Sequence, residues 1–115
     1  MNGEFILLNK IKWLYLYCDK YIFSSFPKNE LAVKIRLETY LHSMIENVIK
    51  ANVNKGNIRK KYQTDLLSDI YLVDYFIGII YLKKIIVKKR FEAFITGLNE
   101  AKRMAYKWIE NEKNL

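Results

Sequence analysis

Apolar residues recur every three or four positions along most of the chain, a spacing that is typical of helices with one buried face. The first such segment runs from about residue 4 to residue 25, and its stripe consists of Phe5, Leu8, Ile11, Tyr15, Cys18 and Ile22. Other positions in the same segment are also apolar, namely Trp13, Leu14, Leu16 and Tyr17. Because this helix is apolar nearly all round, we expect it to be covered on more than one side.

A second helix is predicted after the break SSFPKNE, and it extends to about Asn52. Pro27 suits its first turn, where the missing N–H would have no partner in any case. Glu30 places negative charge near the positive end of the helix dipole. The apolar stripe of this helix is Ile35, Leu41, Met44, Ile45, Val48 and Ile49.

A third helix is predicted over about 58–83, after the break NVNKGN. We expect Gly56 to take a positive φ and end the second helix, and Asn57 to cap the third. The third helix carries two apolar stripes, one of Leu66, Ile70, Val73, Ile77 and Ile80 and one of Leu72, Phe76 and Ile79. Two stripes indicate two buried sides.

The last helix is predicted over about 88–111, although neither Gly nor Pro marks the link before it. The apolar phase changes at KKIIVKK and restarts with Phe91, Phe94, Ile95, Leu98, Ala105, Trp108 and Ile109. Four helices with short links predict an all-α fold, an up-down-up-down antiparallel four-helix bundle over residues 1–111. We expect residues 112–115 to form a flexible C-terminal tail.

Composition adds expectations about assembly and location. Apolar residues make up 51% of the 115 positions, more than a small monomer needs for its core, and this surplus favours an oligomer. Cys18 is the only cysteine, so no intrachain disulfide is expected, and a small buried apolar residue is its simplest interpretation. The longest apolar run, residues 75–82, is too short to span a membrane, and early charges break any signal-peptide pattern. We therefore expect a cytoplasmic protein without a membrane partner.

The net charge of +8 is distributed unevenly. Residues 62–82 contain no Lys or Arg and carry −3, so the remainder carries +11. In an up-down bundle the second and third links lie at opposite ends, which predicts two cationic ends. Solvation, favourable charge at a helix C-terminus and contact with phosphate groups are open interpretations. The candidate cations for binding nucleic acid or a partner are Lys55, Arg59, Lys60, Lys61, Lys84, Lys88, Lys89, Arg90, Lys102, Arg103 and Lys107.

Side chains that could perform catalysis or bind a metal are few. His42 is the only histidine, so neither a Ser-His-Asp triad nor a histidine-based metal site is expected. Asp65 and Asp69 share a helix face, but a di-iron carboxylate site needs Glu-x-x-His pairs, which the chain lacks. We expect these two acids and Asp74 to pair with lysines of a neighbouring helix or subunit. We expect no enzymatic activity, no metal and no cofactor.

Nine Tyr, six Phe and two Trp raise two alternatives, base stacking and packing. Most of these rings lie on the apolar stripes, which favours packing in the core or between subunits. Tyr106 lies off the main stripe beside Arg103 and Lys107. It is therefore the candidate for an exposed ring near cations.

Two stretches of the chain resemble the Avd-type family, the accessory variability determinants of diversity-generating retroelements. The first is FPKNELAVKIRLETYLHSMIENVIKAN, whose motif residues are Phe26, Pro27, Lys28, Arg36, Leu37, Glu38, Ala51 and Asn52. The second lies in the last predicted helix, where the pattern Glu-x-x-Arg-Met-x-x-x-Trp is matched by Glu100, Arg103, Met104 and Trp108. The resemblance covers about residues 10–110.

This resemblance implies a ring-like homo-oligomer of four-helix bundles, a pentamer, with a basic channel. It implies that the chain binds a reverse transcriptase and its template RNA, with DNA as an alternative, and supports mutagenic reverse transcription. In that family's pattern Arg103 contacts a partner and Trp108 packs.

The chain departs from the family in two places. The family's small residues around the last motif are replaced by Lys102, Ala105, Tyr106 and Lys107, and residues 62–82 lack the arginines usual in its third helix. A different partner surface is therefore an open alternative. So are a relation to the bundle proteins encoded by intervening sequences of bacterial ribosomal RNA genes, and a plain protein-interaction scaffold.

Overall fold

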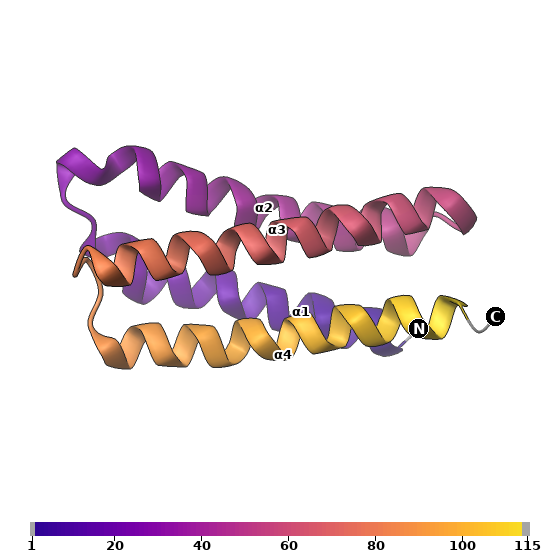
Figure 1. The fold of residues 1–115 in the computed structure, drawn as a ribbon. Helices are drawn as coiled ribbons and strands as arrows, with labels where there is room; N and C mark the ends of the chain where they lie inside the picture. The colour runs from indigo at the N-terminus through magenta and orange to yellow at the C-terminus, as the bar shows by residue number, and fades with distance from the viewer. Residues whose placement is uncertain (1, 114–115) are drawn as a thin grey trace.

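The computed structural model describes residues 2–113, with side chains from residue 6 to residue 112, and the long elements in that range are all helices (Figure 1). α1 spans Asn2–Tyr17 and continues through a π-helical segment, Cys18–Ile22, and a 3-10 turn, Phe23–Ser25. Another 3-10 turn, Lys28–Glu30, leads into α2, Leu31–Val53. α3 spans Gly56–Leu82 and α4 spans Lys88–Lys113. The prediction of an all-α chain with four helices is confirmed.

The helix bounds differ from the predicted ones by a few residues. α4 continues to Lys113, so Glu112 and Lys113 of the predicted tail are helical, whereas residues 114–115 lie outside the described part. Gly56 takes the predicted positive φ, 61°, but it does not end the second helix, because α2 stops at Val53 and Gly56 is the first residue of α3. Asn57 lies inside α3 and does not cap it, because the helix already begins at Gly56 and Lys55 is the residue before it.

The four helices lie alongside one another in a compact, elongated body of 47 × 23 × 19 Å (Figure 1). Contacts join α1 to α2, α2 to α3, α3 to α4 and α4 to α1, so the helices enclose a shared core. The α2–α3 link lies at one end of the body and the α3–α4 turn at the other. The two cation-rich links are therefore far apart.

The core follows the predicted stripes of α3 and α4 closely. On α3 the whole first stripe is buried, and on α4 the buried apolar side chains are Phe94, Leu98, Ala101, Ala105 and Trp108. The second stripe of α3 is only half-buried. One of its members, Phe76, stacks on Tyr40 of α2 with 5.8 Å between the ring centres.

Two predicted core positions on α2 are wrong. Ile35 and Ile49 are 51% and 47% exposed. The reason is helical phase, since spacings of four and three residues give a buried stripe of Leu37, Leu41, Met44, Val48 and Ala51. A residue two positions before Leu37 points away from that stripe and toward the outer surface. On α1, in the same way, Leu7 and Leu14 are buried while Leu8 and Tyr15 are half-buried.

A buried polar contact joins α2 to α3. The amide of Asn47 donates a hydrogen bond to a carboxylate oxygen of Asp69 at 2.8 Å, and both residues are buried. Burial raises the pKa of Asp69, while hydrogen bonds from Ser43 and Asn47 oppose the rise. The expectation that Asp69 pairs with a lysine is therefore wrong, because its carboxylate faces the amide of α2.

The other two acids of α3 do pair with lysines. Asp74 lies 3.4 Å from the ammonium of Lys102 on α4, as expected for a neighbouring helix. Asp65 lies 3.1 Å from Lys61, which belongs to its own helix. Both pairs are partly exposed, so each adds little to the free energy of unfolding.

The α3–α4 turn closes without glycine, so no glycine marks it in the sequence. Lys84 takes a φ of 61°. Its N–H donates to the carbonyl of Tyr81, and the N–H of Ile85 donates to the carbonyl of Ile80, both at 2.9 Å. This is a Schellman motif, whose left-handed residue is usually glycine. The side chain of a lysine at that position costs about 1 kcal/mol.

Candidate nucleic-acid interface

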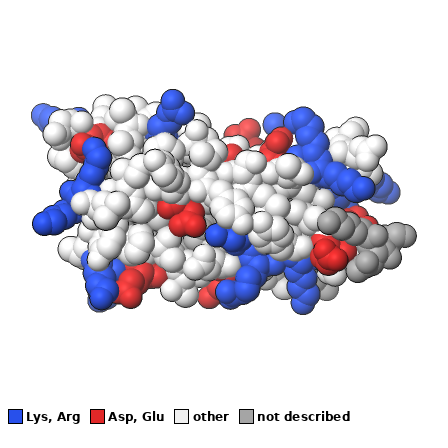
Figure 2. All heavy atoms as spheres, viewed as in Figure 1, with Lys and Arg blue, Asp and Glu red and all other residues white. Residues whose placement is uncertain are grey.

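The basic end of the molecule is defined by Lys84, Lys88, Lys89 and Arg90, at the α3–α4 turn and the start of α4. Figure 2 shows Lys and Arg side chains gathered at both ends of the body, with fewer of them along its middle. Lys84, Lys88 and Lys89 are exposed, and none of them forms an ion pair with another described residue. Their charge is therefore available to solvent or to an anionic partner.

Lys83 belongs to the same turn but has a structural contact. Its ammonium donates to both carboxylate oxygens of Glu30 at 2.9 Å. This ion pair joins the α3–α4 turn to the 3-10 turn before α2. The basic end is therefore supported by two segments that are distant in sequence.

At the opposite end, the side chain of Arg59 has a structural role. Its Nε donates to the carbonyl oxygens of Ala51 and Asn54 at 2.8 and 2.9 Å, and its Nη2 donates to that of Asn52 at 3.2 Å. The end of a helix leaves such carbonyls without helical partners. Its Nη1 pairs with Glu112 of α4. The guanidinium is thus occupied within the chain, which gives this candidate binding residue a structural role.

Three lysines surround Arg59 at the surface. Lys61 pairs with Asp65 and lies 4.8 Å from the centre of the Tyr62 ring. Lys55 and Lys60 are exposed and form no ion pair within the described part of the chain. This end therefore presents fewer free cations than its sequence predicted.

The later cations of α4 are Lys102, Arg103 and Lys107, which lie outside the basic end. The ammonium of Lys102 lies 3.4 Å from Asp74 and 4.6 Å from the centre of the Tyr71 ring, so it bridges α3 and α4. Tyr106 is 46% exposed, in agreement with the prediction, and its hydroxyl shares a hydrogen bond of 2.8 Å with that of Tyr71. This hydrogen bond raises the pKa of Tyr106. The ring near a cation is thus that of Tyr71.

The predicted binding cations do not form one patch. Arg103 and Lys107 are exposed on α4, away from the helix links. The chain's own groups occupy Arg59, Lys61 and Lys102. The densest group of cations without an ion pair among the described residues is the basic end.

A row of aromatic rings on α1 and the π-helical segment after it is a further candidate that the apolar stripes did not reveal, and it consists of Trp13, Tyr17 and Tyr21. The ring centres of Trp13 and Tyr17 are 5.1 Å apart, and those of Tyr17 and Tyr21 are 4.9 Å apart. We call these three rings the aromatic strip. Its sequence signal is a spacing of four residues between rings, which was hidden among the other apolar residues of α1.

Cations lie over both ends of the aromatic strip. The ammonium of Lys10 is 5.4 Å from the centre of the Trp13 ring. At the other end, Lys20 lies 5.2 Å and the guanidinium carbon of Arg90 lies 4.1 Å from the centre of the Tyr21 ring. These distances are typical of cation–π interactions. Because Arg90 belongs to the basic end, the strip and the basic end are continuous.

Gly97 of α4 lies against Trp13, at one end of the aromatic strip. A Cβ atom at this position would lie 2.7 Å from Cζ3 of Trp13, which is too close for two carbon atoms. Glycine therefore allows the indole to lie against the backbone of α4. Trp13 still remains 42% exposed, so a large part of the ring is accessible.

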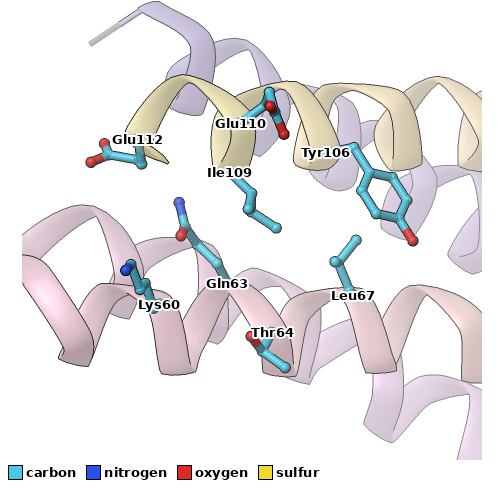
Figure 3. Close-up of a pocket in the computed structure, with 8 residues that line it drawn as sticks. All are labelled: Lys60, Gln63, Thr64, Leu67, Tyr106, Ile109, Glu110 and Glu112. Carbon is cyan, nitrogen blue, oxygen red and sulfur yellow. The ribbon is translucent and has the colours of Figure 1, made fainter. Parts of the chain in front are cut away.

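A pocket of about 340 Å³ lies between the first half of α3 and the last turns of α4 (Figure 3). Gln63 lines it, is 1% exposed, and has an amide nitrogen without a hydrogen-bond partner among the described residues. This donor suits an uncharged acceptor such as a carbonyl oxygen or water. Glu110 and Glu112 lie beside Lys60 in the lining, so the pocket does not favour a phosphate group.

The side chains that could perform catalysis or bind a metal do not lie close together. Cys18 is buried, and burial raises the pKa of its thiol. His42 is exposed, and its ring centre lies 5.1 Å from that of Tyr15. Among the side chains of residues 6–112, no three His, Cys, Asp or Glu are close enough to hold a metal ion. No helix within residues 2–113 has both the length and the apolarity needed to cross a membrane.

No protein-family model, curated protein or solved structure matches the chain. The interpretation of the site therefore depends on its own residues and their geometry.

Proposed function

We propose that this chain is a non-enzymatic, cytoplasmic accessory protein of a diversity-generating retroelement. It binds the template RNA and the reverse transcriptase, and it supports mutagenic reverse transcription by electrostatic docking and scaffolding. The resemblance of two stretches of the sequence to the Avd-type family supports this proposal. The net charge of +8 supports it as well, because a basic domain favours anionic partners.

The observation that carries the proposal is the group of exposed lysines at the basic end. Lys84, Lys88 and Lys89 form no ion pair with described residues, so binding to phosphate groups breaks no existing contact of theirs. Lysines contact phosphates with little dependence on base sequence. Such binding weakens as salt rises, because each contact releases a condensed counterion.

The proposal includes assembly of up-down-up-down bundles into a ring-like homo-oligomer, a pentamer by resemblance. Its support is a part of α3 that has no cations and exposes Tyr75 and Leu82. Gly78 lies between them in the helix, where glycine costs about 1 kcal/mol relative to alanine. A Cβ there would have no neighbour within 4 Å, so packing inside the chain does not require glycine. A second copy would cover both side chains and approach Gly78 closely.

A binding titration against a structured RNA tests the proposal. We expect the logarithm of the affinity to fall linearly with the logarithm of the salt concentration. Replacing two contacting lysines, Lys88→Gln with Lys89→Gln, should reduce the slope by about 2. The matched control, Lys12→Gln with Lys50→Gln, removes the same charge elsewhere and should change the slope less. An affinity independent of salt, or equal effects of the two pairs, would contradict the proposal.

Light scattering tests the assembly. We expect a particle several times heavier than the 13.8 kDa chain, and we expect Tyr75→Glu to dissociate it without loss of helicity. A lone particle of chain mass would exclude the oligomer. A gene for a reverse transcriptase beside a template and variable repeat pair would support the partner, and co-purification of that enzyme would test it directly. A position inside a ribosomal RNA gene would instead favour the intervening-sequence proteins.

A further inference from the structure

We propose that the aromatic strip, Trp13, Tyr17 and Tyr21, is a stacking platform for the bases of a single-stranded nucleic acid whose backbone is held at the basic end. This inference rests on the proposed function, because it requires nucleic-acid binding. It goes beyond that function by naming the strand state that the protein recognises and the surface that it uses.

The spacing of the rings suits successive bases. The centres of neighbouring rings are 5.1 and 4.9 Å apart, so the strip from the Trp13 ring to the Tyr21 ring is at most about 10 Å long. Proteins that bind single strands without sequence preference stack successive bases on aromatic side chains along a basic groove. Because neighbouring rings lie against each other at these distances, bases contact the parts of the rings that stay exposed, above all the 42% exposed Trp13, and do not insert between the rings.

The rings are held in place before a strand binds. Trp13 and Tyr17 are stacked with only 28° between their planes, and the indole lies against α4 at Gly97. At the other end, the guanidinium of Arg90 lies 4.1 Å from the centre of the Tyr21 ring. Rings that are already ordered lose little conformational entropy when a base stacks on them.

The two ends of the aromatic strip differ in the charged groups beside them. Lys10 at the Trp13 end pairs with Glu100 at 2.7 Å, so its charge is compensated within the chain, and this pair lowers the pKa of Glu100. Lys20 and Arg90 at the Tyr21 end form no ion pair with a described residue. Phosphates are therefore attracted to the Tyr21 end, next to the basic end, while bases reach toward Trp13.

The same charges argue against a second copy of the chain as the occupant. In a symmetric dimer the same patch faces itself, so both sides of the interface would carry the positive charge of Lys20 and Arg90. Like charges brought together in an interface oppose association. A polyanion with exposed aromatic bases complements both the cations and the rings.

The test compares single-stranded with duplex RNA. The variant carries Trp13→Leu, Tyr17→Leu and Tyr21→Leu, which keep an apolar side chain at each position and remove each ring. We expect its affinity for an oligouridylate of about 12 nucleotides to fall at least about tenfold, and its affinity for a duplex of the same length to change less than about twofold. Tyr106→Leu is the matched control, because it removes an exposed ring outside both the strip and the proposed interface between copies, and it should leave both affinities unchanged.

Tryptophan fluorescence gives a direct readout of stacking. The chain has two tryptophans, and Trp108 is buried, so Trp108→Phe leaves Trp13 as the single indole. We expect oligouridylate to quench this fluorescence. In the reciprocal variant, Trp13→Phe, the remaining Trp108 should not be quenched.

The outcomes separate this inference from the proposed function. If the unmodified chain binds RNA and the triple variant binds oligouridylate equally well, the strip is not a stacking platform, and the proposed function stands. If the unmodified chain binds no RNA at any salt concentration, both fail. A triple variant with a changed oligomeric state would assign the strip to an interface between copies and would overturn the inference.

Discussion

The two cation-rich links of this bundle, α2–α3 and α3–α4, use their positive charge differently. At the α2–α3 link, Gly56 supplies the positive φ and Arg59 donates to the last carbonyls of α2. At the α3–α4 turn, backbone hydrogen bonds close the Schellman motif around Lys84, and Lys88 and Lys89 stay exposed. The α2–α3 link thus uses Arg59 for the fold and leaves Lys55 and Lys60 exposed, whereas the α3–α4 turn uses Lys83 for an ion pair and leaves more of its lysines to solvent or a partner.

The largest expected effect concerns Arg59. Arg59→Ala leaves carbonyls of α2 and the carboxylate of Glu112 without their donor, so we expect the free energy of unfolding to fall by about 2–3 kcal/mol in urea denaturation. Lys60→Ala, the neighbouring exposed cation, should change it by less than about 0.5 kcal/mol. Arg59→Lys should not rescue stability, because an ammonium lacks the planar fork. Equal effects of the two alanine variants would remove the contrast between the links.

Gly56 gives the next largest effect. Gly56→Ala should lower the free energy of unfolding by about 1 kcal/mol, because a Cβ is disfavoured at a φ of 61° and no neighbouring atom adds a clash. The matched control is Gly78→Ala, the same substitution inside a helix, which should raise stability by up to about 1 kcal/mol. Thermal unfolding of both variants measures the sign of each change in the free energy of unfolding. A loss of stability in both would indicate contact between Gly78 and another copy, because no atom of the same chain lies within 4 Å of a Cβ at that position.

Lys84 offers the converse experiment at the other link. Lys84→Gly should raise the free energy of unfolding by somewhat less than about 1 kcal/mol, because glycine accepts the left-handed conformation but also gains freedom in the unfolded chain. The same variant should bind RNA more weakly, since it lacks one of the exposed cations. Stability and affinity therefore move in opposite directions, as calorimetry and an RNA titration can measure. An affinity equal to that of the unmodified chain would remove Lys84 from the binding surface.

The smallest effect is expected at the ion pair between Lys83 and Glu30. Both side chains are partly exposed, so Lys83→Ala should lower the free energy of unfolding by no more than about 0.5–1 kcal/mol. The effect should disappear at about 1 M salt, where the screening length is about 3 Å. An effect that survives high salt would indicate that packing of the lysine stem, rather than charge, joins the two segments.

The sequence predicted the fold well where a single stripe decides burial. Every residue of the stripe from Leu66 to Ile80 on α3 is buried, because spacings of three and four keep one face inward. Ile35 and Ile49 show where the spacing of apolar residues does not predict burial. Both are as apolar as the buried residues of α2. Only the rotation of the helix, set by its packing against the neighbouring helices, keeps them out of the core.

The candidate site was less predictable, because its contacts join distant segments. Nothing near Arg59 in sequence indicates that it reaches Glu112, and nothing near Tyr21 indicates that Arg90 lies over its ring. The α3–α4 turn lacked a glycine signal because Lys84 occupies the left-handed position. Charge density alone therefore located the candidate cations but did not separate structural from available ones.

The π-helical segment Cys18–Ile22 contains one residue more than an α-helical path would need between the same two points. Cys18 and Ile22 are both buried, so the core tolerates this longer turn. Deleting one amino acid here would let α1 continue as a regular helix, whereas a deletion upstream would rotate all preceding residues by about 100° around the axis. Insertions and deletions that keep the core inward are therefore expected to concentrate in this segment of α1.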